Sequence, residues 1–387
     1  MSSRRVLLFV PAVVASENQT ATRIAELLAQ AATKARPGTW SVQSTPRELN
    51  AVVIGPSGEP ELEVVQVDYL SALMRNVRGA DTKPDANGVF SSLWFAVRGT
   101  GRLLRSWGRH QKSPKAKAQL TLAFFAVLLL WVCFAILLLA LVAAVASVWL
   151  PDWTLRDTTG GKLALSGGVV GVLVWLYWRT RAGVLANGAR LRAIMAYFEH
   201  PEERLYLTSV FDEAFDAILE KDPEAEVHVF AFSFGSIVTL DALFPDVSGV
   251  ERRVLDRVSS LVTMGCPADL VHLLYPKHFD DTRISRRDDL PWRNVFMPLD
   301  ILGSNFVESK SDGHPGGEAG KDVRELTIGG AAPGEHVAVG ASTMSPWLVF
   351  VFRGFVVHGK YWDARQPRHL EHLLPLWLPP AGTSPPS

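Results

Sequence analysis

The sequence predicts an α/β fold in which a mostly parallel β-sheet is flanked by helices. Short apolar runs bounded by turn residues alternate along the chain with segments whose apolar residues recur at helical spacing. The apolar runs are nearly continuous, as in strands that helices cover on both faces. This alternation of strand and helix is typical of a parallel sheet.

The N-terminal part of the sheet is expected before residue 80. Residues 5–10 form an apolar run that predicts a buried strand, and the apolar spacing from Ile24 to Ala31 predicts a helix over about 20–34. Two further strands, 51–54 and 63–67, are separated by the turn sequence GPSGEP. A helix is expected from Tyr69 to about Arg78.

An alternative interpretation exists for the first residues. The sequence MSSRRVLLFVPAVVASENQ resembles a signal peptide, with two arginines, a short apolar core and small residues after it. Secretion would place the basic residues before the later apolar segment outside the cytoplasm, against the positive-inside rule. We therefore favour a strand.

The same alternation of strand and helix resumes after residue 200. Apolar residues from Leu207 to Ile218 share one helical face, and VHVFAF (227–232) predicts a strand followed by a helix over 236–243. Further strands are expected at 258–264 and 292–297. The polar, glycine-rich stretch 308–321 is expected to be a mobile loop, and the final PPAGTSPPS to be disordered.

Two uncharged segments predict a transmembrane hairpin inserted into this fold. Leu120–Leu150 contains no charged residue and, at about 1.5 Å per residue, is long enough to cross a bilayer core of about 30 Å. Leu163–Trp178 is also uncharged but shorter, so on length alone it could be a buried or interfacial helix. We expect spans at about 120–150 and 160–178.

The charges around the two spans predict their orientation. The linker between them carries two basic and two acidic residues, whereas both outer flanks are basic. The basic residues of the flanks are Arg102, Arg105, Arg109, Lys112, Lys115, Lys117, Arg179, Arg181, Arg190 and Arg192. Both flanks, both termini and the α/β domain are therefore expected in the cytoplasm. An even number of spans is also needed to return the chain to one sheet.

Composition excludes several classes of function. The formal net charge is zero, so nothing indicates nucleic-acid binding. Two cysteines cannot form a disulfide framework. His272, His278, Asp280 and Asp281 match no metal-binding spacing, and no phosphate-binding glycine loop is present. We expect no cofactor and no metal.

One serine interrupts the apolar sequence VHVFAFSFGSIVTLDAL. Ser233 stands between the expected strand and the expected helix, with Ala231 two residues before it and Gly235 two residues after it. Small residues at these positions allow a sharp turn that presents a nucleophile. The backbone N–H of Phe234 would then lie at the helix N-terminus, where it can stabilise an oxyanion.

Around this motif the sequence resembles a serine esterase or lipase of the α/β-hydrolase superfamily. Besides A-F-S-F-G, the resemblance is carried by VTMGCP after the next strand, by WRNVFMPLD ending at Asp300, and by HGKYWD, with His358 and Tyr361. It covers roughly residues 1–75 and 195–370. The resemblance implies a catalytic triad of Ser233, Asp300 and His358, in the chain order of that fold.

Two features depart from the family pattern. Ala231 replaces the first glycine of the usual G-x-S-x-G motif, and the loop FVPAVVASEN lacks the usual His-Gly pair after the first strand. A backbone N–H around Ala12 or Val13 is our candidate for the second oxyanion donor, because Pro11 has none.

Other residues compete for the acid and base roles. Asp269 follows the Gly-Cys-Pro turn and is the rival acid, and His336 is the rival base. Asp241 is expected to lie on the surface of the helix after Ser233.

The sequence therefore predicts a membrane-anchored serine hydrolase that cleaves a lipid ester or an acyl thioester. Its expected parts are 1–100 and 183–375 for the two pieces of the hydrolase domain, 101–182 for the basic juxtamembrane segment and hairpin, and 376–387 for a disordered tail. The alternative is a non-catalytic scaffold of the same fold that binds a protein partner. A transporter or receptor is poorly supported, because the spans carry no charges.

Overall fold

The computed structural model divides into two compact units, residues 1–73, 109–119 and 200–387, and residues 74–108 and 120–199. Within them the structure describes residues 4–13, 20–44, 49–73, 98, 100–102, 119–121, 124, 125, 128, 131, 193–244, 253–280, 290–297, 300–304, 324–327, 358–362 and 368–378. The first unit contains the sheet.

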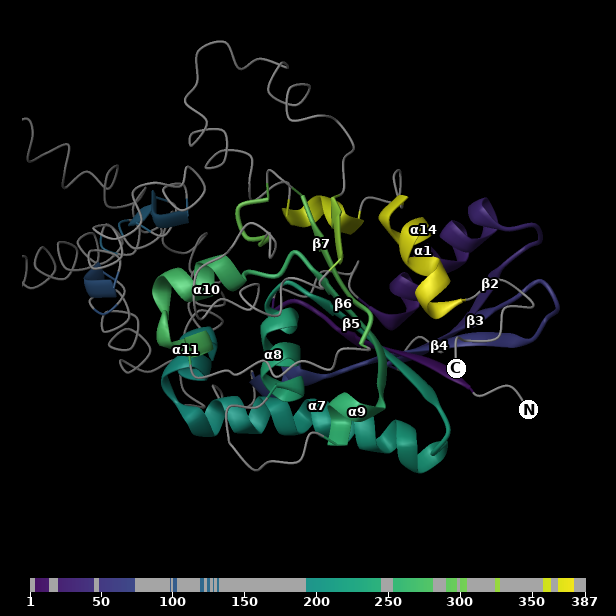
Figure 1. Cartoon of the computed structure of the whole chain (residues 1–387), viewed down its shortest axis with the longest axis horizontal. Helices are drawn as coiled ribbons and strands as arrows, with labels where there is room; N and C mark the ends of the chain where they lie inside the picture. Colours follow the sequence, from purple (N-terminus) through teal and green to yellow (C-terminus); the bar gives the residue numbers. More distant parts are fainter. Residues whose placement is uncertain are drawn as a thin grey trace, which may run out of the picture. The chain divides into compact units, whose positions relative to one another are not determined.

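One eight-stranded sheet organises this unit, in the order β2-β3-β4-β1-β5-β6-β7-β8 (Figure 1). Its strands are β1 (Arg5–Val10), β2 (Ser41–Ser44), β3 (Asn50–Ile54), β4 (Pro60–Gln66), β5 (Glu226–Phe232), β6 (Val258–Met264), β7 (Trp292–Phe296) and β8 (Arg324–Thr327). All neighbouring pairs from β4 to β8 are parallel, and only β2-β3 and β3-β4 are antiparallel. The prediction of a mostly parallel sheet is confirmed.

The apolar runs predicted most of these strands, and the missed strands are polar. β1 and β6 have the expected bounds, so the first apolar run is a strand of the central sheet. The sequences of β2, SVQS, and β8, RELT, contain no apolar run, and each strand lies at an edge of the sheet. An edge strand pairs on one side only and needs little apolar surface.

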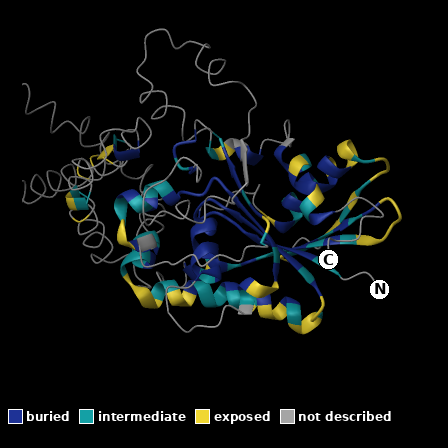
Figure 2. Cartoon of the chain, viewed as in Figure 1, coloured by how far each residue is buried: buried dark blue, intermediate teal, exposed yellow. Residues whose placement is uncertain are grey.

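Helices cover both faces of the sheet (Figure 1). On one face lie α1 (Ala21–Ala35) and α14 (Arg368–Trp377), and on the other lie α7 (Pro201–Lys221) and α8 (Phe234–Leu243). Shorter helices of the same unit include α9 (Arg253–Arg257), α10 (Ala268–Leu274), α11 (Lys277–Asp280) and the 3₁₀ turn η3 (Lys360–Trp362). Because both faces are covered, five of the six residues of β1 and six of the seven residues of β5 are buried (Figure 2).

Alternate residues of the central strands supply the core beneath α1 and α14. This cluster includes Phe9, Phe230 and Phe232 from the sheet, and Trp377 and Leu378 from the end of α14. Trp377 is fully buried, and its ring lies 5.3 Å from that of Phe230. The first residues of the expected tail 376–387 therefore belong to the fold, because α14 continues into the core; 379–387 lie outside the described residues.

The direction of chain progression changes between β1 and β5. After β1 the chain forms β2 at one edge of the sheet and returns through β3 to β4, which pairs with β1; it then adds β5 to β8 on the other side of β1. Val10, the last residue of β1, pairs with Ala231. In open parallel sheets the connections that leave two such strands run in opposite directions, and ligands commonly bind in the crevice outside the carboxyl ends of the strands. Ser233 and the loop 11–13 follow these two strand ends.

The expected transmembrane hairpin lies almost entirely outside the described residues. Among the helices that the structure describes, none combines the length and the apolar character needed to cross a membrane. Residues 119–121, 124, 125, 128 and 131 are helical. The expected loop 308–321 also lies outside the described residues.

Candidate active site

Ser233 lies at the joint between β5 and α8, as the sequence predicts. It is the N-cap of α8, with φ 55° and ψ −126°, and is the only described residue other than glycine with a positive φ. Its backbone N–H donates to the carbonyl oxygen of Met264 at 2.9 Å, which fixes the strained turn to β6. Strain of this kind persists where the surrounding structure enforces it, and it is common at functional sites.

Gly235 allows the turn to approach the loop after β1. A Cβ atom at this position would lie 2.3 Å from the carbonyl oxygen of Pro11 and 2.6 Å from that of Val10. Both are backbone atoms that cannot rotate away. Ala231, which replaces the other glycine of the motif, is accommodated as a fully buried residue of β5.

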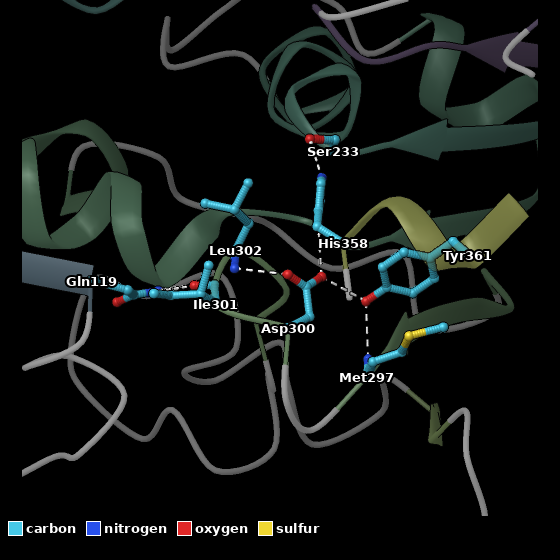
Figure 3. Close-up of polar contacts among 8 residues, drawn as sticks. All are labelled: Gln119, Ser233, Met297, Asp300, Ile301, Leu302, His358 and Tyr361. Atoms are coloured by element: carbon cyan, nitrogen blue, oxygen red, sulfur yellow. Dashed lines mark hydrogen bonds and ion pairs between the residues drawn. The ribbon is translucent and has the colours of Figure 1, made fainter. Parts of the chain in front are cut away.

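His358 stands between Ser233 and Asp300 (Figure 3). Its Nε2 lies 2.9 Å from Ser233 Oγ, and its Nδ1 lies 2.9 Å from Asp300 Oδ2. Asp300 is fully buried, whereas the side chain of His358 is 13% exposed. The three residues that the sequence singled out, separated by up to 125 positions, thus form one hydrogen-bonded series.

The carboxylate of Asp300 is bonded at both oxygens. Oδ2 accepts a hydrogen bond from the hydroxyl of Tyr361 at 2.8 Å, and Oδ1 accepts from the N–H of Leu302 at 2.9 Å (Figure 3). A Cβ atom at residue 303 would come 2.6 Å from Oδ2, so Gly303 leaves the space that the carboxylate occupies. A buried carboxylate needs such partners to remain charged.

Tyr361 connects the carboxylate to the end of β7. Its hydroxyl accepts the N–H of Met297 at 2.9 Å while it donates to Asp300. Burial, together with the charge of Asp300, raises the pKa of Tyr361 well above its ordinary value. The hydroxyl therefore keeps its proton and acts as a donor. The sequence contained this residue in HGKYWD, but its spacing from His358 did not reveal its partner.

The imidazole of His358 packs against residues of β5 and the turn after β6. The ring of Phe232 stacks on it, with centroids 5.2 Å apart and planes 16° apart. Gly265 has φ 57°, and a Cβ atom there would lie 3.0 Å from Cε1 of His358. The glycine of VTMGCP thus provides both a left-handed turn and room for the imidazole.

The segment WRNVFMPLD contributes to a buried hydrogen-bond network. Trp292 Nε1 donates to Thr263 Oγ1, and Thr263 Oγ1 donates to Asn294 Oδ1, at 3.1 and 3.0 Å. Asn294 Nδ2 then donates to the carbonyl oxygen of Ser304 at 2.8 Å. The network ties β6 and β7 to the turn 300–304 that carries Asp300.

The oxyanion candidates follow the two strand ends. Phe234 is the first residue of α8, and Ala12 and Val13 follow β1 as buried residues. The loop is held by Tyr69, whose hydroxyl donates to the carbonyl oxygen of Pro11 at 2.6 Å. Burial raises the pKa of Tyr69, so this donor stays protonated. The assignment of the donor N–H groups stays a prediction.

The rival residues occupy other places. Asp269 lies in the first turn of α10, and its N–H donates to Ser304 Oγ at 2.7 Å. His358 Nδ1 instead faces Asp300, and His336 lies outside the described residues. Cys266 is fully buried, and burial raises the pKa of its thiol, so it is not a competing nucleophile.

The expectation that Asp241 lies on the helix surface is wrong. It is buried, and its Oδ2 lies 3.1 Å from Nε2 of His278, which is also buried. Because α8 is covered on nearly all sides, its polar residues Ser236, Thr239 and Asp241 are all buried. No group of three or more His, Cys, Asp or Glu residues in the described part of the chain could hold a metal ion.

Comparison with known proteins gives no relative from which a function could be transferred. No protein-family model, curated protein or solved structure matches the chain. The function must therefore be inferred from the site.

Proposed function

We propose that the chain is a membrane-anchored serine hydrolase of the α/β-hydrolase superfamily that cleaves an acyl ester, either a lipid ester or a thioester. One observation carries the proposal: Ser233, in a strained turn, is 2.9 Å from His358, which is 2.9 Å from the buried Asp300. A nucleophile, a base and an orienting acid in this order are the elements of covalent acyl transfer.

Acylation begins when Ser233 Oγ attacks the acyl carbonyl carbon while His358 Nε2 takes the hydroxyl proton. Asp300 accepts the Nδ1–H bond, which fixes the imidazole tautomer and stabilises the imidazolium. The N–H of Phe234, with a donor from Ala12 or Val13, stabilises the oxyanion. The tetrahedral intermediate collapses, the bond from the acyl carbon to the leaving oxygen or sulfur breaks, and the imidazolium returns its proton to the leaving group.

Deacylation repeats these steps with water as the nucleophile. His358 Nε2 removes a proton from water, whose oxygen attacks the acyl carbon of the Ser233 ester. Collapse releases the carboxylic acid and returns the proton to Ser233 Oγ. No cofactor or metal is required by this sequence of steps.

Membrane anchoring rests on the uncharged segments and on exposed apolar side chains within the first of them. Phe124, Phe125, Leu128 and Trp131 are helical and exposed. Apolar residues at such density suit a lipid environment. The direct pairing of β1 with β5 favours an even number of spans, since residues on both sides of the insertion join one sheet. We therefore place both termini and the catalytic unit in the cytoplasm.

A fluorophosphonate probe tests the activity. Full-length protein in detergent should react covalently at Ser233, and Ser233→Ala should abolish the labelling. Ser209→Ala is the matched control, because the Ser209 hydroxyl donates only to its own helix, at Tyr206. If folded wild-type protein is not labelled and cleaves no acyl ester, the hydrolase is excluded and the non-catalytic scaffold is favoured.

The substrate class and the anchor need separate measurements. Activity on p-nitrophenyl esters and acyl thioesters of increasing chain length should rise with length for a lipid substrate, whereas preference for acetyl would contradict it. Extraction of membranes with alkaline carbonate should leave the protein in the pellet, and its release would contradict a spanning anchor.

A further inference from the structure

Gln119 connects the start of the insertion to the turn that carries the acid. It directly precedes Leu120, the first residue of the first expected span. Its side chain is buried, and its Nε2 donates to the carbonyl oxygen of Ile301 at 2.7 Å (Figure 3). The two residues are 182 positions apart, so the bond joins distant parts of the same compact unit.

The carbonyl that Gln119 holds belongs to the turn around Asp300. The N–H of Asp300 donates to the carbonyl oxygen of Met297, and the N–H of Leu302 donates to Asp300 Oδ1, both at 2.9 Å. Ile301 lies between these two bonds and is fully buried. A displaced Ile301 peptide would therefore move the N–H that holds the carboxylate.

Gln119 and Tyr361 hold this turn through different groups. Tyr361 bonds the carboxylate itself, at Oδ2, whereas Gln119 bonds the backbone next to it. The orientation of His358 depends on both of these hydrogen bonds, because Asp300 can hold the imidazole only where Oδ2 lies within hydrogen-bond distance of Nδ1. Misplacement of a catalytic group by about 1 Å can cost about a hundredfold in rate.

We propose that Gln119 is a positioning residue for Asp300: its hydrogen bond to the Ile301 carbonyl holds the turn that keeps the acid in register with His358. The inference rests on the proposed function and adds a positioning residue to it.

A double-mutant cycle with the substitutions Gln119→Met and Asp300→Asn tests the positioning role. Methionine keeps the length and flexibility of glutamine but has no donor. We expect Gln119→Met to lower kcat about fivefold, because one hydrogen bond that positions the turn is lost, and to change KM little. In the Asp300→Asn background the same substitution should have no further effect, because Gln119 acts through Asp300. Equal losses in both backgrounds, or no loss in wild type, overturn the proposal.

Gln66→Met is the control for this cycle. Gln66 is a partly buried glutamine whose Oε1 accepts the N–H of Ala21 at the start of α1. Its effect on kcat, whatever its size, should be the same with and without Asp300→Asn. If Asp300→Asn alone leaves kcat unchanged, the proposed triad fails. If it abolishes most activity and Gln119→Met is nonetheless additive, only the role of Gln119 fails. Melting temperatures of the variants separate loss of positioning from loss of folded protein.

Discussion

Gly235 packs its α-carbon against the carbonyl oxygen of Pro11, so closely that a Cβ atom would approach this oxygen to 2.3 Å. This contact joins the turn after β5 to the loop after β1, and both loops contribute to the proposed site. Tyr69 holds the other side of the same carbonyl, through its hydroxyl at 2.6 Å. The turn at Ser233, the proposed nucleophile, and the loop proposed to supply the second oxyanion donor are therefore held together at a backbone carbonyl.

Gly235→Ala should disrupt this arrangement. The methyl group meets two carbonyl oxygens, of Pro11 and Val10, that cannot move without shifting β1. We expect a loss of about 1–3 kcal/mol in the free energy of unfolding, as for overpacking elsewhere, and a large loss of labelling by the fluorophosphonate probe. Gly101→Ala is the matched control, since a Cβ atom there meets nothing within 4 Å. Equal effects of the two substitutions on labelling would contradict the prediction.

Asp300→Asn should reduce kcat far more than Asp269→Asn. The amide cannot take the place of the carboxylate beside Nδ1 of His358, and losses of about 10⁴-fold are typical of such a change. Asp269 lies on α10, where its N–H contacts Ser304, so its substitution should have a much smaller effect. Steady-state kinetics on one ester substrate compares the two. A greater loss in Asp269→Asn would reverse the assignment of the acid.

The sheet and the three proposed catalytic residues could be predicted from the sequence because each lies in a short segment with a recognisable pattern. Continuous apolar runs predicted β1, β5 and β6, and the A-F-S-F-G motif located the turn at Ser233. Resemblance to a family supplied Asp300 and His358, which spacing alone does not connect. The short edge strands were missed because their sequences, SVQS and RELT, contain no apolar run.

The contacts around the acid could not be predicted, because they join residues distant in sequence through three-dimensional packing. Nothing in the sequence near Gln119 indicates Ile301, and nothing near Gly303 indicates that its missing side chain makes room for Asp300 Oδ2. The error at Asp241 has the same origin. Its partner His278 lies on α11, a helix that the apolar pattern did not predict.

Tyr361→Phe should separate the role of the hydroxyl from that of the ring. The ring can stay in place, but Asp300 Oδ2 loses a donor and the N–H of Met297 loses its acceptor. We expect kcat to fall about tenfold and the free energy of unfolding to fall by about 1–3 kcal/mol, since a buried donor is left unsatisfied. Tyr206→Phe, at an exposed tyrosine of α7, is the control. Wild-type kcat in Tyr361→Phe would show that the hydroxyl does not orient the acid.

Buried histidines should make the fold less stable in acid. Burial, with a smaller contribution from His372, lowers the pKa of His369 to about 4; burial and Arg5 lower the pKa of His228 to about 4. Between about pH 6.5 and 4 the unfolded chain binds protons that the folded protein does not. The contribution of these neutral histidines to the free energy of unfolding is therefore fully present above pH 6.5. As the pH falls through this window, each histidine lowers the free energy of unfolding by up to about 1.4 kcal/mol per pH unit.

His369→Leu tests this prediction at the residue whose ring nitrogens have no hydrogen-bond partner among the described atoms. Urea unfolding at several pH values should give a shallower decline below pH 6.5 in the variant than in wild type. His200→Gln, which removes an exposed histidine, should keep the wild-type slope. A slope unaffected by His369→Leu would mean that this imidazole is protonated in the folded state.

Asp212 on α7 should have the opposite pH dependence. Burial, together with the charge of Asp216, raises the pKa of Asp212 to about 6. Between about pH 3.8 and 6 the folded protein holds a proton that the unfolded chain releases. This residue therefore lowers the free energy of unfolding progressively as the pH rises, and the loss is complete above pH 6. Asp212→Asn removes the charge, and the free energy of unfolding at pH 7 should increase by about 1 kcal/mol after allowance for solvent screening of a half-buried group. Glu213→Gln, one residue along the same helix and equal in charge change, is the control. No gain in Asp212→Asn at pH 7 would show that the charge of Asp212 does not destabilise the fold. An equal gain in Glu213→Gln would show that the destabilisation comes from the net charge of the helix and not from the buried carboxylate.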